Sequence, residues 1–136
     1  MACPFFSPSE RAENLALPHP ARLPLGAAWR GTCSVAGGEL VQLGAVELES
    51  CNLGYANACP RLPKERAADA VRFAVNKESA ERLQIQFVLE SKHLPINSGT
   101  LQYDRVAQSW TSEHSDSRIQ RLADCFLQAY LERNLP

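Results

Sequence analysis

The second half of the chain carries a regular alternation of apolar and polar positions. One run alternates at Val71, Phe73 and Val75. A second, longer run follows a polar segment at 76–81 and alternates at every other position from 83 to 89. This period of two is typical of strands with one buried face. A loop is expected at 95–99, and a third short run then places Leu101 and Tyr103 on one face. Because the connections are short, the sequence predicts a three-stranded antiparallel sheet.

The last apolar pattern has a helical period instead. Beyond Ser117, apolar residues recur every three or four positions, which predicts a helix with one buried face. These residues are Ile119, Leu122, Ala123, Phe126 and Tyr130. Ser117 followed by Gln120 resembles a capping box, so we expect the helix to begin there. A helix backing the sheet gives an α+β fold class.

The first half of the chain lacks such periodicity and is rich in residues that interrupt regular structure. Residues 1–63 hold seven of the nine prolines, six of the seven glycines and four of the five cysteines. The sequence therefore predicts a single domain, 1–136, in which 1–63 form an irregular lobe and 64–136 form the sheet and helix. Three prolines predict an extended strap at 17–25. A helix is compatible with the apolar spacing in 39–55.

Charge and hydropathy exclude several function classes. The chain has 14 basic and 15 acidic residues, giving a net charge of −1, so nothing favours nucleic acid or an anionic membrane as a partner. No apolar run approaches the roughly 20 residues that span a bilayer. The N-terminus has neither the basic nor the apolar region of a secretory signal. We therefore expect a cytoplasmic protein with reduced thiols.

Four cysteines are the most informative feature of the sequence. Cys3 and Cys59 are each followed by proline, and Cys33 and Cys51 lie close to glycines. Proline after a cysteine shapes the turn around a bound centre, and a Cys-Pro step ends one bacterial iron–sulfur motif. Glycine lets backbone amides approach sulfur. On one unbroken helix Cys51 and Cys59 would lie about 12 Å apart, so shared ligation requires a bend between them.

Several interpretations of these four thiols are open. Disulfides are disfavoured because no secretory signal is found. A structural zinc site is chemically ordinary, but its ligands normally come in close pairs, whereas the spacings here are 29, 17 and 7 residues. An iron–sulfur cluster tolerates scattered ligands, and we expect a [4Fe–4S] cluster bound by Cys3, Cys33, Cys51 and Cys59. The fourth interpretation is that the thiols bind nothing.

A resemblance accompanies these cysteines. The segments CPFF at 3–6, CNLGYA at 51–56 and CPRLP at 59–63 resemble those of a group of small uncharacterised bacterial four-cysteine proteins. The resemblance covers about the first half of the chain. It implies a recurring four-cysteine architecture and no established activity.

The sequence contains no catalytic constellation, which favours a role other than catalysis. No thiol has a base at motif spacing, and there is no Cys-x-x-Cys pair. Cys125 is expected to be a small buried core residue, and His19 to have no ligand role. The expected function is electron transfer or redox sensing, and the alternative is a zinc-stabilised protein-interaction adaptor. A redox or other protein partner is expected, and the oligomeric state is left open.

The basic residues after Cys59 allow two readings. Arg61, Lys64, Arg66 and Arg72 either solvate the link between the two lobes or form a docking patch for an acidic redox partner.

Overall fold

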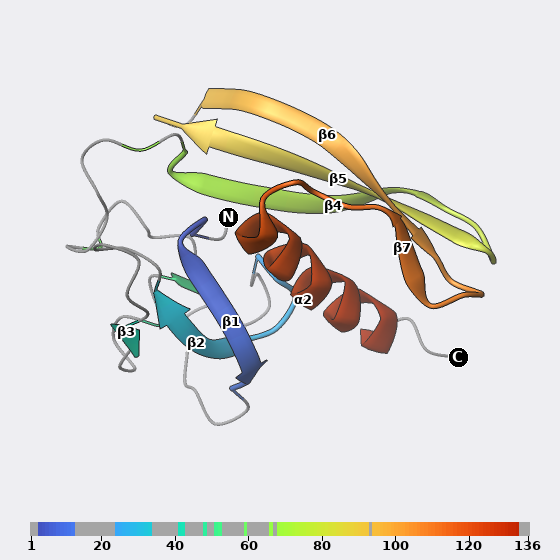
Figure 1. Ribbon diagram of the computed structural model, residues 1–136, viewed down its shortest axis with the longest axis horizontal. Helices are drawn as coiled ribbons and strands as arrows, with labels where there is room; N and C mark the ends of the chain where they lie inside the picture. The colour runs from blue at the N-terminus through green and yellow to red at the C-terminus, as the bar shows by residue number, and fades with distance from the viewer. Residues whose placement is uncertain are drawn as a thin grey trace.

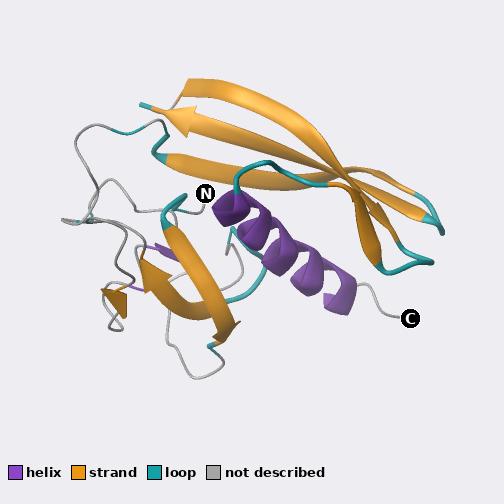
Figure 2. Ribbon diagram, in the orientation of Figure 1, coloured by secondary structure: helices purple, strands orange, loops and turns teal. Residues whose placement is uncertain are grey.

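A computed structural model of the chain describes residues 3–12, 24–33, 41–42, 48, 51–52, 59, 66, 68–92 and 94–133. Within them, two antiparallel sheets lie on either side of one long helix (Figures 1 and 2). The smaller sheet has the order β1-β2-β3 and the larger has the order β4-β5-β6-β7. The elements are β1 (Phe6–Arg11), β2 (Trp29–Cys33), β3 (Val41–Gln42), β4 (Ala70–Glu78), β5 (Arg82–Ser91), β6 (Leu94–Asp104), β7 (Ser109–Ser112) and α2 (Ser117–Arg133).

The larger sheet contains the predicted strands and one more. The alternating apolar residues of β4 and β5 pair across the sheet, as Val71 with Leu89 and Phe73 with Phe87. The prediction of a single three-stranded sheet is wrong, because β7 pairs with the end of β6. This four-residue strand has only one large apolar residue, Trp110, so no alternation revealed it. The Trp110 ring meets Tyr103 edge to face at a centroid distance of 5.4 Å.

Strand β6 begins earlier than the sequence predicts. Residues 95–99 belong to the strand, and Lys92, just after β5 ends, has a φ of 52°. Pro95 pairs opposite Glu90, and a register shift next to it accommodates an extra residue, as expected of proline beside a bulge. Gly99 lies beneath the Phe87 ring: a Cβ there would come within 2.9 Å of Cζ. Both residues, which are typical of turns, therefore fit the strand. Pro95 fits because of the bulge, and Gly99 fits because the Phe87 ring occupies the space of a side chain.

The smaller sheet gives regular structure to part of the N-terminal lobe, which the sequence predicts to be irregular. Strands β1 and β2 pair antiparallel, with Phe6 opposite Cys33 and Pro8 opposite Gly31. A register shift after Pro8 places this proline at a bulge, where its missing N–H is tolerated. Of the predicted strap at 17–25, only the last two residues lie within the described part of the chain. In the predicted 39–55 helix, Leu48, Cys51 and Asn52 are helical, whereas Val41 and Gln42 form β3.

Helix α2 joins the two sheets through a common core. The predicted apolar face is buried, and one cluster of buried side chains extends from the small sheet through α2 to the large sheet. Two arginines of the helix contact β1 and the residue before it. Arg121 Nε donates to the Pro8 carbonyl at 2.8 Å, and the Arg118 guanidinium lies 5.3 Å from the Phe5 ring centre. Strand β1 is therefore held both by β2 and by the helix.

The cap of α2 lies one residue before the predicted one. The Asp116 carboxylate accepts a hydrogen bond from the Arg118 amide at 2.9 Å, and the Asp116 carbonyl accepts the first helical bond, from Gln120. The Gln120 side chain also reaches back, but it accepts from the His114 amide. Ser117 is thus the first helical residue rather than the cap. Asp is as good a cap as Ser, so the sequence did not distinguish them.

The cap predicts a pH-dependent stability. Burial alone would raise the pKa of Asp116, but hydrogen bonds from Arg118 outweigh it and lower that pKa. The stabilisation is therefore present above the unfolded-state pKa of about 3.9 and lost as pH falls through the lower folded-state pKa. We expect D116A to lose about 1 kcal/mol at pH 7. D116N should keep the cap, and its free energy of unfolding should not show this additional loss in acid. Urea unfolding at pH 7 and pH 3 measures both effects. Identical acid losses in wild type and D116N would contradict the assignment.

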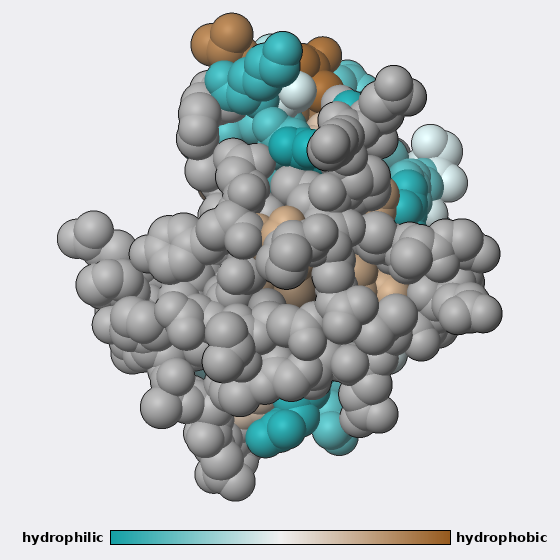
Figure 3. Space-filling model, turned by 90° about the vertical axis from the view of Figure 1, so that its left-hand side faces the viewer, coloured by the Kyte–Doolittle hydropathy of each residue, from teal (hydrophilic) through white to brown (hydrophobic). Residues whose placement is uncertain are grey.

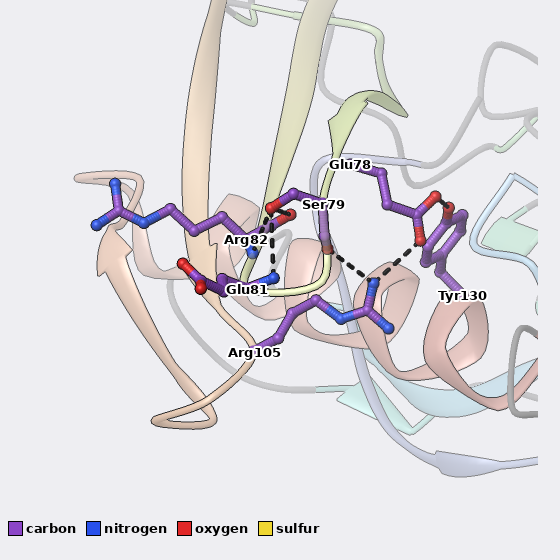
Figure 4. Close-up of polar contacts among 6 residues, drawn as sticks. All are labelled: Glu78, Ser79, Glu81, Arg82, Arg105 and Tyr130. Atoms are coloured by element: carbon purple, nitrogen blue, oxygen red, sulfur yellow. Dashed lines mark hydrogen bonds and ion pairs between the residues drawn. The ribbon is translucent and has the colours of Figure 1, made fainter.

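Polar contacts close the far end of the large sheet (Figure 4). Ser79 Oγ accepts from the Arg82 amide at 3.0 Å in the β4–β5 turn. Arg105 donates to Glu78 at 3.1 Å, and the Tyr130 hydroxyl donates to the other Glu78 oxygen at 2.7 Å. These contacts connect the β4–β5 turn, the end of β6 and the last turns of α2. They lie at the opposite end of the large sheet from the start of β4 (Figure 1). We assign them a structural role.

Candidate metal centre

Cys3 opens a tight turn that leads into β1. The Phe6 amide donates to the Cys3 carbonyl at 3.1 Å, closing a four-residue turn. Pro4 occupies the second position, where its fixed φ suits such a turn. The backbones of Phe5 and Phe6 also hydrogen-bond to the Cys3 thiol. These backbone hydrogen bonds lower the pKa of the Cys3 thiol, but burial outweighs them.

Cys33 is brought beside this turn by strand pairing. It ends β2 and lies opposite Phe6, the residue that closes the turn. The pairing requires β1 and β2 to approach closely at Gly31, where a Cβ would lie 2.0 Å from the Ser7 carbonyl oxygen. Cys3 and Cys33 are thirty residues apart in the chain, and the pairing of β1 with β2 brings them to the same end of the small sheet. This pairing requires glycine at position 31.

Cys51 is held against the same strand by its neighbour. Asn52 is buried, and its Oδ1 accepts from the Trp29 amide at 2.8 Å while its Nδ2 donates to the Trp29 carbonyl at 2.9 Å. The same Nδ2 donates to the Leu48 carbonyl at 2.8 Å. One amide side chain thus replaces a strand partner for Trp29 and docks the helical residues Leu48, Cys51 and Asn52 on β2. Nothing in the sequence singles out this asparagine, because its pattern depends on a distant strand.

The four predicted ligands differ in exposure. Cys3, Cys33 and Cys51 are 7%, 5% and 6% exposed and belong to one core cluster, whereas Cys59 is half-buried. Burial is the largest influence on Cys3 and raises the pKa of its thiol to about 11; the charges of Cys33 and Cys59 raise it further. Both thiols therefore lie within electrostatic reach of Cys3. Burial thus disfavours the thiolate form of Cys3.

The sulfur atoms do not converge on one point. Among the residues that the structure describes, no three side chains of His, Cys, Asp or Glu lie close enough to hold a single metal ion. All five cysteines are among these residues, and none forms a disulfide. Three of the predicted ligands, Cys3, Cys33 and Cys51, thus share one core cluster and Cys59 lies outside it, and the described residues form no metal-holding group.

The remaining candidate residues have other environments. Cys125 is completely buried on α2 as expected, and burial raises the pKa of its thiol to about 11. His114 packs on Phe87 at a centroid distance of 4.7 Å, and its Nδ1 accepts from the Asp116 amide. His19 lies outside the described residues.

The basic stretch after the cysteines is tied to buried acids. Arg66 pairs with Asp69, and Arg72 pairs with Glu90. Both carboxylates are buried, and Asp69 also accepts from the Lys92 amide at 2.7 Å. These two arginines therefore fix the chain where it enters the large sheet, which favours the structural reading of this stretch. Arg61 and Lys64 lie outside the described residues.

Comparison with protein-family models, with curated proteins and with solved structures gave no match. In the described part of the chain, no helix has the length and apolar character needed to cross a membrane.

Proposed function

We propose that Cys3, Cys33, Cys51 and Cys59 bind one iron–sulfur cluster, of the [4Fe–4S] type, and that the protein uses it in electron transfer or redox sensing. The observation that carries the proposal is the Cys3 turn. The Phe6 amide closes this turn on the Cys3 carbonyl, the Cys3 side chain is buried, and strand pairing places Cys33 opposite Phe6. Amide donors to cluster sulfurs tune reduction potential, and a buried cluster is shielded from solvent.

The preference for a cluster over zinc rests on the spacing of the cysteines in the sequence, because the ligands of structural zinc sites normally come in close pairs. Zinc binds each sulfur at about 2.3 Å, so four cysteines must meet at one point. Among the described residues no three such side chains lie close enough to hold a metal ion, and only the charges of Cys33 and Cys59 act on Cys3. A four-iron cluster binds each cysteine through a different iron atom, so its ligands stand apart by the width of the inorganic core. The zinc-stabilised adaptor is the alternative.

A cytoplasmic location is part of the proposal. The five cysteines form no disulfide, as expected where thiols are kept reduced. We propose a protein partner that exchanges electrons with the cluster, and no nucleic acid, because the net charge is only −1.

Single cysteine substitutions test the ligand set. We expect C3A, C33A and C51A, purified without oxygen, to hold about tenfold less iron than wild type, because each removes a thiolate that the buried site cannot replace. The matched control is C125A, which truncates another buried cysteine and should keep its iron. The measurement is iron and sulfide per chain, with circular dichroism to confirm folding. Equal iron in C33A and C125A, with both folded, would contradict the proposal.

A further inference from the structure

The two edges of the large sheet differ in how they are protected against pairing with another strand. Strand β4 forms one edge and carries Arg72, Lys77 and Glu78, charged side chains of the kind that discourage such pairing. At the other edge, β7 pairs only with residues 102–104 at the end of β6. Among the strands that the structure describes, residues 94–101 therefore have β5 on one side and no partner on the other (Figure 1).

This unpaired part of β6 is exposed and uncharged. Every residue from Leu94 to Ser98 is exposed, and the apolar side chains of Leu94 and Ile96 have 66% and 51% of their surface exposed. No charged residue occurs between Leu94 and Tyr103. An edge that has exposed apolar side chains and lacks charge is a template on which another strand can pair.

We propose that this edge is a self-association surface, at which residues 96–101 of β6, the pairing stretch, pair antiparallel with the pairing stretch of a second copy. The charge pattern is the argument for a second copy. An antiparallel pair of identical strands is two-fold symmetric, so each residue faces a residue of the same stretch. Like charges directly opposite each other destabilise such a pair. Because the pairing stretch has no charge, no register within it creates this repulsion.

The neighbouring residues define both ends of the pairing stretch. Pro95 has no amide hydrogen to donate to a second strand, and β7 occupies the edge of β6 from Gln102 onwards. The four-stranded sheets of the two copies would join into one continuous sheet. An interface built on one short strand is small, so we expect a weak dimer that forms as the protein concentration rises. This inference does not depend on a bound cluster.

Analytical ultracentrifugation of the whole chain, with a reductant to prevent disulfides between copies, tests the proposal. The wild type should change from monomer towards dimer between about 1 µM and about 1 mM, the range of weak association. I96K should raise the dissociation constant about tenfold or more, because like charges across the pair repel. The matched control is V106K, since Val106 is 76% exposed but lies in the turn after β6. V106K should dimerise as the wild type does.

Two further measurements locate the contact. S98K places a lysine at a second exposed position of the pairing stretch and should weaken dimerisation as I96K does, with circular dichroism to confirm folding. In the wild type, exchange of the backbone amide hydrogens of residues 96–101 should slow as the dimer forms. A wild type that stays monomeric at about 1 mM would overturn the proposal, and the edge would then be left to another partner. Equal dimerisation of folded I96K, S98K and V106K would also overturn it.

Discussion

Replacing Gly31 with alanine is expected to separate β1 from β2. A Cβ at this position would lie 2.0 Å from the Ser7 carbonyl oxygen and 2.8 Å from the Pro8 Cα, both of them backbone atoms that cannot rotate away. The strands would have to move apart, which costs about 3 kcal/mol or more. Because β1 carries the Cys3 turn and β2 carries Cys33, we expect G31A also to lose bound iron. Urea unfolding and iron analysis of the same preparation measure both effects.

Gly99 provides the matched control for this substitution. It also lies in a strand, and its added Cβ would come within 2.9 Å of an atom, but that atom is the end of the Phe87 ring. A side chain can shift, and alanine also restricts the unfolded chain, so G99A should change stability by about 1 kcal/mol or less. If G31A were as stable as G99A, the close approach of β1 and β2 would not exist as described.

Replacing Asn52 with alanine is the second substitution with a large expected effect. It leaves the Trp29 amide and carbonyl and the Leu48 carbonyl without the partners that Asn52 supplies. Each buried group left unsatisfied costs about 1–3 kcal/mol, and together they are comparable with the stability of a small domain. We expect N52A to release Cys51 from β2 and lower iron binding.

Asn76 serves as the control for N52A, because it is an asparagine exposed on β4. N76A should unfold at nearly the wild-type urea concentration, whereas the midpoint of N52A should fall steeply. Equal midpoints for N52A and N76A would show that the Asn52 contacts with Trp29 contribute nothing.

Part of the fold follows from periodicity alone. Strands β4 and β5 and helix α2 were predictable because each buries one face against a partner, which imposes a period of two or of 3.6. The start of β6 was not, because Pro95 and Gly99 are turn residues by propensity and fit the strand only through a bulge and the Phe87 ring. Strands β1 and β2 were not predicted for the same reason. Pro8 and Gly31 are turn residues by propensity, and they fit these strands only through a bulge and a close approach of the two backbones.

The site was predictable to a lesser degree. The concentration of cysteines in one lobe singled out the four residues, and the structure places three of them in one core. Their mutual arrangement depends on long-range contacts that no local pattern reports, above all those of Asn52 with Trp29.

The exposed apolar side chains at the start of β6, Leu94 and Ile96, also carried no sequence signal. Apolar residues gather at the top of Figure 3, over that end of the large sheet.

The central claim is that the cysteine lobe holds an iron–sulfur cluster. The most direct test is iron, sulfide and zinc analysis of the wild-type protein purified without oxygen, together with its absorption spectrum. We expect about four irons and four sulfides per chain and a broad visible absorption that bleaches on reduction. One zinc per chain without visible absorption, or no metal at all, would contradict it.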